Sequence, residues 1–403
     1  MTSSTSRIHR LQCAMRMQQI QPFFVMEILD RAYRLQQAGR SVIHLEVGEP
    51  DFPTPDPVVA AGISALQAGK TKYTPALGLG ALRRAVAAQY PDEVRPDMER
   101  IALTPGSSGA LQLVFAVLLD PGDEVLLADP GYPCNRNMIS LFGGIAKGIA
   151  VGPERAYQLT ADIVRENWSA NTRAVLLASP SNPTGTIVGP AQMKQIADTV
   201  EELGGVLIVD EIYHGLTYGE QVRTVLFESQ HAWVVNSFSK YFGMTGWRLG
   251  WLVVPDGYID EVNKLAQNLF ISPSSIAQHA ALHAFDAEVS AELERRRGEF
   301  KRRRDYLVPA LRDLNFQIPV APEGAFYIYA DCSALTDDSE SLVLDILEQT
   351  GVAITPGRDF GSYRAHAHVR FSYANTMQNL ERAVSRLKDY LSKRDRSAGD
   401  RPL

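Results

Sequence analysis

Between residues 100 and 254, short apolar runs alternate with helical patterns, and this alternation constrains the fold more than any other feature. The apolar runs span residues 100–103, 124–128, 146–150, 174–178, 206–209, 232–237 and 249–254. Strands that alternate with helices are typical of a mostly parallel sheet covered on both faces. The run Val206-Leu207-Ile208-Val209 is apolar throughout, as expected for a strand buried on both sides. We therefore predict an α/β fold with a mostly parallel seven-stranded sheet sandwiched by helices.

The two ends of the chain carry a different pattern from its middle. A helical pattern at 24–37 and a short strand at 42–47 come first, and a mixture of strands and helices follows residue 300. The later elements are predicted at 326–329, 340–350, 368–372 and 377–391. We predict a smaller α+β domain built from both chain ends. The predicted boundaries are an N-terminal arm at 1–25, a small domain at 26–56 plus 300–403, and a large domain at 57–299.

Charge and hydropathy exclude several classes of function. The 403 residues carry a net charge of −6, and 45% of them are hydrophobic, which is enough for a large core. A mildly acidic chain is a poor ligand for nucleic acid. The arginine clusters within a predicted helix at 287–314 alternate with glutamates, which indicates a solvated helix face linking two lobes. No apolar run is long enough to span a membrane.

The cysteines and the termini bear on location. Cys13, Cys134 and Cys332 are far apart and lack metal-ligand spacing, so we predict no metal site and a reducing compartment, by default the cytoplasm. The N-terminal segment has no acid before Glu27, a composition that fits either an organellar transit peptide or a disordered or clasping tail. The polar segment 392–403 is predicted to be disordered.

Polar residues follow five of the predicted strands, where open α/β sheets bind their ligands. In chain order these residues are Ser107 and Ser108, Tyr132, Asn182, Asp210 and Lys240. Each has an ordinary structural explanation when taken alone: a serine N-cap, a core tyrosine, a turn asparagine, a capping aspartate and a solvated lysine. Taken together, however, the groups at these five strand ends match the binding groups that one ligand requires.

That ligand is pyridoxal phosphate. Small residues at a helix start expose backbone N–H groups that suit a phosphate, and Ser237, Ser239 and Arg248 flank the lysine. A tyrosine can stack on an aromatic ring, and a buried carboxylate needs a cation such as a pyridinium. A lysine amine can form a Schiff base with an aldehyde.

The motifs that contain these residues resemble those of fold-type I pyridoxal phosphate enzymes, specifically the class I/II aminotransferases. The resemblance covers about residues 26–391. It is carried by Val47-Gly48-Glu49-Pro50-Asp51-Phe52, Tyr73-Thr74-Pro75, Ser179-Pro180-Ser181-Asn182-Pro183-Thr184-Gly185, Asp210-Glu211-Ile212-Tyr213, Ser237-Phe238-Ser239-Lys240 and Val369-Arg370-Phe371-Ser372. Each motif is weak alone, and their combination in this order is highly specific.

The resemblance implies a role for each site residue. Lys240 would hold the coenzyme as a Schiff base and then move the proton at the substrate Cα. Asp210 would pair with the ring nitrogen, a pairing that lowers the pKa of the carboxyl group. Tyr213 and Asn182 would hydrogen-bond the ring oxygen, and Tyr132 would stack on the ring. Ser107, Ser108, Ser237, Ser239 and Arg248 would bind the phosphate.

Further roles implied by the resemblance concern the substrate and a partner subunit. Arg370, with Gly48 and Asn182, would bind the substrate, and Arg370 would grip its α-carboxylate. Tyr73 would reach the phosphate in the neighbouring subunit of a homodimer. Aspartate-specific relatives bring a second arginine from a region that contains none here, residues 254–293. Four phenylalanines are candidates for contact with a neutral or aromatic substrate: Phe23, Phe24, Phe270 and Phe326. His214 is expected to be a packed structural histidine.

The function expected from the resemblance is ping-pong transamination between an L-amino acid and a 2-oxo acid. A carbon–sulfur β-lyase on the same fold is the main alternative, and a cyclase or synthase is another. A regulatory protein that uses the fold as an effector sensor would need a DNA-binding module, and only about twenty residues precede the matched region.

Overall fold

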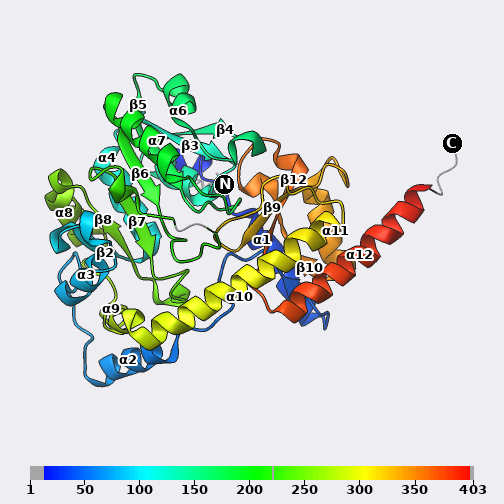
Figure 1. Cartoon of the computed structure of the whole chain (residues 1–403), viewed down its shortest axis with the longest axis horizontal. Coiled ribbons are helices and arrows are strands. Elements are labelled where there is room, and N and C mark those ends of the chain that lie inside the picture. The colour runs from blue at the N-terminus through cyan, green and yellow to red at the C-terminus, as the bar shows by residue number, and fades with distance from the viewer. Residues whose placement is uncertain (1–12, 220–221, 400–403) are drawn as a thin grey trace, which may run out of the picture.

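The computed structural model describes residues 13–219 and 222–399 (Figure 1). Its centre is a single seven-stranded sheet in the order β2-β8-β7-β6-β5-β3-β4. The strands are β2 (Ile101–Thr104), β3 (Glu124–Asp129), β4 (Ile145–Ala150), β5 (Thr172–Ala178), β6 (Val206–Asp210), β7 (Trp233–Ser237) and β8 (Gly250–Val253). Only β8 runs antiparallel to its neighbours. Each predicted strand is therefore present to within two residues, and the predicted fold class is confirmed.

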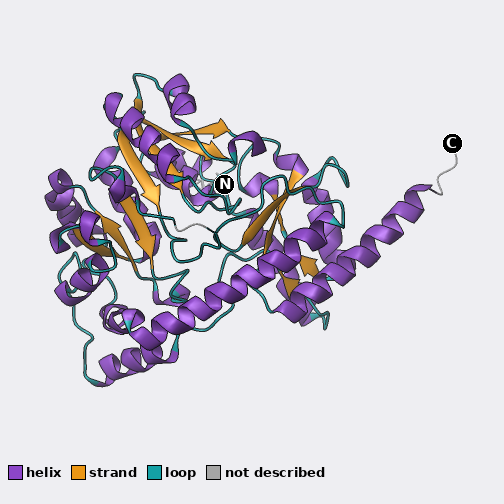
Figure 2. Cartoon of the chain, in the orientation of Figure 1, coloured by secondary structure: helices purple, strands orange, loops and turns teal. Residues whose placement is uncertain are grey.

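Helices cover both faces of this sheet (Figure 2). Along β5, Ala174 and Leu176 belong to one apolar cluster, whereas Val175 and Leu177 belong to another. This alternation follows from the two-residue period of a strand. The covering helices are α3 (Gly80–Ala87), α6 (Ala161–Asn167), α7 (Pro190–Glu202) and α9 (Ser275–Ala281) on one face, and α4 (Gly106–Leu118), α5 (Pro133–Leu141) and α8 (Ile259–Leu269) on the other. Next to α9 lies α2 (Asp56–Gln67).

Both chain ends meet in a second apolar core, as the sequence predicted. A three-stranded sheet in the order β11-β12-β9 and the two-stranded pair β1-β10 form its sheet layer. The elements are α1 (Phe24–Gln37), β1 (Ile43–His44), β9 (Tyr327–Asp331), α11 (Ser339–Thr350), β10 (Val352–Ala353), β11 (Thr355–Pro356), β12 (His368–Ser372) and α12 (Met377–Gly399). The parallel pairing of β1 with β10 joins residues about 300 positions apart. The exact domain boundaries stay a prediction.

One long helix, α10 (Ala287–Arg312), connects the two cores and is the yellow helix in Figure 1. The sequence predicted a solvated face for its arginines, and for two of them this was wrong. Arg296 and Arg303 are buried, and they donate to the Pro53 carbonyl and the Asp51 carboxylate, respectively. Burial is tolerated because both guanidinium groups are paired, and both also lie over the Phe52 ring.

The two terminal predictions have different outcomes. The polar segment after residue 391 was expected to be disordered, but α12 continues to Gly399. The reason is that no proline or glycine interrupts residues 392–398, so an established helix extends at little cost. The predicted transit peptide or clasping tail falls mainly on residues 1–12, which lie outside the described residues.

Candidate active site

A cavity of about 800 Å³ lies at the carboxyl edge of the large sheet, where it faces the second core. The connections that follow β2, β3, β5, β6 and β7 open into it because these five strands all run in the same direction. Eleven of the predicted site residues line it: Gly48, Ser107, Ser108, Tyr132, Asn182, Asp210, Tyr213, Ser239, Lys240, Arg248 and Arg370. Groups separated by more than 300 residues in sequence thus come together at one place.

The start of α4 offers a binding site for an anion. Its N-cap, Pro105, provides no side-chain hydrogen bond, so the first N–H groups of this 13-residue helix are left for a ligand. Arg248 lies close by, since a Cβ on Gly106 would come within 2.5 Å of its guanidinium nitrogen. Gly106 also has a φ of +71°, a conformation that favours glycine. Backbone donors, serine hydroxyls and an arginine together can hold a phosphate.

Lys240 reaches across the cavity from the end of β7. Its Nζ donates to the Gly48 carbonyl oxygen at 2.6 Å and lies 5.9 Å from the centre of the Phe326 ring. Burial lowers the pKa of Lys240 to about 8, and the positive charges of Arg370 and Arg248 act in the same direction. A neutral amine, the form that attacks an aldehyde, is therefore accessible near physiological pH.

Asp210 ends β6 and is buried in the cavity wall. Its Oδ1 accepts a hydrogen bond from the Ile212 N–H at 3.0 Å. Burial raises the pKa of Asp210 to about 7, and this outweighs the hydrogen bond and the charge of Lys240. A cation at this position, such as a protonated ring nitrogen, would hold Asp210 as the carboxylate. The lowered pKa expected with bound coenzyme stays a prediction.

Arg370 is positioned by contacts on several sides. Its Nη1 donates to Asn182 Oδ1 at 2.9 Å and its Nη2 to the Glu46 carbonyl at 2.5 Å. The guanidinium carbon lies 4.4 Å from the Tyr327 ring centre and 4.8 Å from that of Phe360. Arg370 Nε is buried and has no hydrogen-bond partner among the described residues. Because Arg370 lines the cavity, its guanidinium group can bind a carboxylate there.

Tyr327 is a cavity residue that the sequence did not reveal. Its hydroxyl lies 2.9 Å from that of Tyr213, and a Cβ on Gly48 would come within 2.5 Å of it. The pKa of Tyr213 is raised well above its usual value by burial and by this neighbouring phenol. Residues 326–329 are all buried, so no local pattern separates Tyr327 from its neighbours.

The loop after β3 and the start of α1 form another side of the cavity. The Tyr132 ring lies 6.0 Å from that of Phe23, and Cys134 Sγ is 3.4 Å from the Tyr132 hydroxyl. Burial raises the pKa of both Tyr132 and Cys134. Three further α1 residues that the sequence did not single out also line the cavity: Val25, Met26 and Leu29.

Two predicted site residues do not reach this cavity. Ser237 is buried beside it, and its hydroxyl lies 2.9 Å from that of Ser239. Tyr73 is 80% exposed on the loop after α2. Of the four phenylalanines, only Phe23 lines the cavity. Phe24 faces a neighbouring groove, Phe270 packs on the apolar core of the large sheet, and Phe326 is fully buried.

Residues 40–387 match the family described as aminotransferase class I and II. The sequence is 39% identical to valine–pyruvate aminotransferase of Mycobacterium tuberculosis, over 92% of this chain and 97% of that protein. It is 37% identical to (5-formylfuran-3-yl)methyl phosphate transaminase of Methanocaldococcus jannaschii, over 94% of this chain and 99% of that protein. A crystal structure of an aminotransferase from Mycobacterium tuberculosis superposes with a TM-score of 0.91 at 38% identity, covering 95% of this chain and 99% of that one.

The chain belongs to the class I and II aminotransferases. It is thus a pyridoxal phosphate-dependent enzyme of fold type I, and the family expected from the sequence motifs is confirmed.

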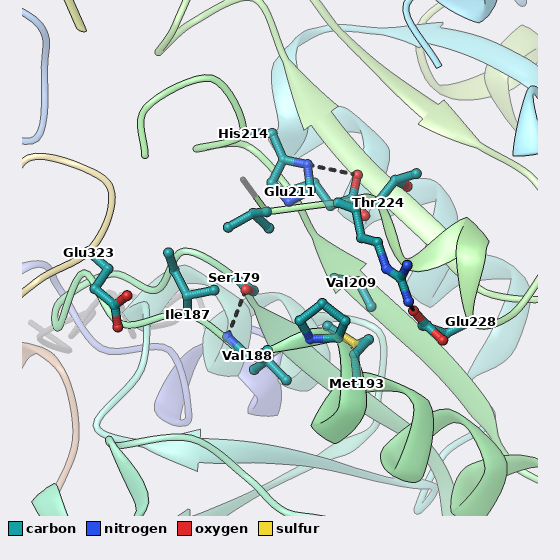
Figure 3. Close-up of a pocket in the computed structure, with 14 residues that line it drawn as sticks. Ser179, Ile187, Val188, Met193, Val209, Glu211, His214, Thr224, Glu228 and Glu323 are labelled. Atoms are coloured by element: carbon teal, nitrogen blue, oxygen red, sulfur yellow. Dashed lines mark hydrogen bonds and ion pairs between the residues drawn. The ribbon is translucent and has the colours of Figure 1, made fainter. Parts of the chain in front are cut away.

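The aminotransferase has a second, smaller cavity of about 180 Å³ on the other side of β6 (Figure 3). His214 lines it, with its Nδ1 3.3 Å from a carboxylate oxygen of the buried Glu211. His214 does not line the larger cavity, and its packed structural role stays a prediction. The side chains of Arg223 and Glu228 pair across another part of its wall.

Neither a metal site nor a membrane span is found in the described part of the aminotransferase. Across residues 13–219 and 222–399, no group of three or more His, Cys, Asp or Glu side chains is arranged to hold a metal ion. Within the same residues, every helix is too short or too polar to cross a membrane.

Proposed function

We propose that this aminotransferase transfers the amino group of an L-amino acid to a 2-oxo acid by a ping-pong mechanism, with pyridoxal 5′-phosphate bound at Lys240. The observation that carries the proposal is the position of Lys240 Nζ. It lies in the same cavity as the buried Asp210, the uncapped start of α4 and the guanidinium group of Arg370. An amine, a carboxylate, an anion site and a carboxylate-binding arginine are the groups that the reaction requires.

The residues present fit the coenzyme. The start of α4, with Ser107 and Ser108, would bind its phosphate together with Ser239 and Arg248. Gly106 leaves room for Arg248 to approach. Ser237 would support Ser239 through their paired hydroxyls. Tyr132 would stack on the ring. When bound, pyridoxal phosphate supplies an aldehyde that accepts the amino group and a ring that withdraws electrons from the substrate Cα.

The polar side chains of the cavity would control protons and orientation. Asp210 would hold a proton at the ring nitrogen, because its buried carboxylate is stabilised by a cation there. Tyr213 and Asn182 would donate hydrogen bonds to the ring oxygen. Lys240 would bind the aldehyde carbon and, once released, take the proton from the substrate Cα and return it.

Arg370 would bind the substrate α-carboxylate, with Gly48 and Asn182 beside it. Its Nη1 donates to Asn182 Oδ1 and carries a second N–H that can donate to the substrate. The Tyr327 and Phe360 rings fix the guanidinium plane. The guanidinium group would therefore already be oriented for the α-carboxylate when the substrate binds.

A homodimer is part of this proposal. The outer face of α2 exposes Val59, Ile63 and Leu66, and Tyr73 follows on the next loop with 80% of its surface exposed. Contiguous exposed apolar side chains are typical of an interaction surface. Tyr73 lies outside the cavity of its own chain, so its proposed contact is with the phosphate site of the partner subunit.

We further propose the arm, small-domain and large-domain boundaries predicted from the sequence, and a cytoplasmic location. Most residues of the second apolar core lie within the predicted small domain, which supports the boundaries. Three free cysteines support a reducing compartment.

The test is a half-reaction without an oxo acid. Purified protein loaded with pyridoxal phosphate is mixed with single L-amino acids, and its visible spectrum is recorded. Conversion to pyridoxamine phosphate, reversed by the matching 2-oxo acid, is the expected result. Accumulation of pyruvate and ammonia would instead identify a β-lyase, an activity that the aminotransferase relatives named above do not favour.

Lys240→Ala is the matched control. This variant should still bind the coenzyme through the phosphate site, yet lose at least about a thousandfold in the rate of proton transfer. Near-normal turnover by Lys240→Ala would disprove the mechanism.

A further inference from the structure

One side of the cavity is apolar, and the proposed transfer chemistry does not require it. The start of α1 contributes Phe23, Val25, Met26 and Leu29 to this wall. Met26 is 52% exposed, so this wall leaves apolar surface in contact with water. A ligand with an apolar group would cover this surface and gain free energy by removing it from water.

This chain contributes to the cavity no unassigned cation that could bind an acidic side chain. Among the described residues that line it, the cations are Lys240, Arg248 and Arg370. The proposed function assigns all three, to the aldehyde, the phosphate and the α-carboxylate. Of the two acids at the wall, Asp210 is assigned to the ring nitrogen, and Glu49 is an exposed acid that would repel a second carboxylate.

The apolar wall is held at a fixed place relative to Arg370. The Asp359 carboxylate accepts hydrogen bonds from the N–H groups of Phe24 and Val25, both at 2.8 Å. The next residue, Phe360, has its ring under Arg370, at 4.8 Å. The adjacent residues Asp359 and Phe360 therefore position the start of α1 and Arg370, respectively. A substrate held by its α-carboxylate would direct its side chain to a wall of defined position.

We infer that the amino-acid substrate has an uncharged, apolar side chain, and that Phe23, directly before α1, and Met26 and Leu29 of α1 select it. The inference rests on the proposed function, because Arg370 must hold the α-carboxylate for the side chain to reach α1. It adds a substrate class and the residues that determine it. The relatives named above differ in the substrates their names print, so the family alone does not specify this class.

The first experiment measures binding and does not depend on catalysis. The protein loaded with pyridoxal phosphate is titrated calorimetrically with 4-methylpentanoate, 3-phenylpropanoate, maleate and glutarate, which carry no amino group to transfer. The two apolar monocarboxylates are expected to bind at least about tenfold more tightly than the two dicarboxylates, a difference of about 1.4 kcal/mol.

Met26→Ala tests the residues. Because Met26 is half-exposed, its replacement leaves the core intact. We expect about five- to tenfold weaker binding of 4-methylpentanoate, from the loss of one or two buried methylene contacts. Acetate has no side chain, so its affinity should not change. Gln36→Ala, on an exposed part of the same helix, should leave every affinity unchanged.

The outcomes separate the inference from the proposed function. Tighter binding of maleate or glutarate, or an unchanged affinity of Met26→Ala for 4-methylpentanoate, would overturn the inference. Transfer from L-aspartate in preference to L-leucine would also overturn it and leave transamination standing. Selective binding of apolar acids without transfer from any L-amino acid would overturn the proposed function and leave the selective role of α1 standing.

Discussion

At the scale of single residues, burial gives the two central ionisable groups unusual pKa values in opposite directions. The pKa of Lys240 falls to about 8 and that of Asp210 rises to about 7 because each charged form loses hydration. Both neutral forms are accessible near physiological pH. A lysine that must attack and a carboxyl group that must pair with a ring cation are suited to such surroundings.

The pH dependence of coenzyme uptake follows from the lysine. Only the neutral amine attacks an aldehyde, and Lys240 loses its proton as the pH rises through about 8. The rate at which the coenzyme-free protein takes up pyridoxal phosphate should therefore increase with pH, with a midpoint near 8. Stopped-flow absorbance measures this rate. A midpoint near 10.5, the usual value for lysine, would contradict the assigned surroundings.

Tyr327→Phe tests the hydroxyl pair. The change removes the partner of the Tyr213 hydroxyl, so we expect about 1 kcal/mol lower stability and a shifted pH titration of the bound coenzyme's absorbance. The ratio kcat/KM should fall about tenfold.

The chain supplies a control on the same strand. The Tyr329 hydroxyl is buried and has no hydrogen-bond partner within the described residues, so Tyr329→Phe should change none of these quantities. An equal effect of both substitutions would mean that the loss of any buried hydroxyl has this effect, and that the Tyr213–Tyr327 pair has no specific role.

At the scale of elements, the sequence predicted α1 and β12 to the residue, because their periodicity is strong. It could not predict which side of α1 faces the cavity. That side is set by Asp359, which lies 335 positions from the Phe24 N–H that it binds. It also missed the burial of Arg296 and Arg303, because their partners lie in another segment, about 250 positions away. Local sequence patterns therefore predict where helices and strands lie. Contacts between distant segments determine which side of each element is buried.

The cap of α1 can be tested against the cap of another helix. Asp359→Ala removes two hydrogen bonds to the start of α1, and Asp338→Ala removes the equivalent pair at the start of α11. Each variant should lose about 1 kcal/mol of unfolding free energy in urea titrations. Only Asp359→Ala should raise KM, by about tenfold with a smaller change in kcat, because only α1 borders the cavity. Equal KM values for the two variants would argue against a role for the cap in substrate binding.

At the scale of the whole molecule, the cavity lies between two cores connected by α10. The sequence predicted which segments form each core, but not the order of the strands or the paired arginines that attach α10 to the segment around Asp51. The proposed site is completed by a second copy of the chain, through Tyr73.

The dimer is testable by sedimentation equilibrium, which should give twice the mass of one chain. Ile63→Glu places a charge on the exposed face of α2 and should shift the equilibrium towards monomer, with weaker coenzyme binding. Ile145→Glu, at a similarly exposed apolar residue on the other edge of the sheet, should leave the mass unchanged.

Tyr73→Phe should keep the dimer and bind the coenzyme about tenfold more weakly, as loss of one charge-assisted hydrogen bond implies. A monomeric protein with full coenzyme affinity would refute the shared site.

The five connections that follow β2, β3, β5, β6 and β7 each bring a different group to the cavity. Mutations in one connection can therefore change the binding group that this connection contributes, while the strands of the sheet stay intact. The wall formed by α1 is separate again, since it belongs to a distant part of the chain. A mutant library confined to Met26 and Leu29 would vary substrate preference while the proposed coenzyme-binding residues stay unchanged, and it is the natural starting point for evolving new selectivity in this enzyme.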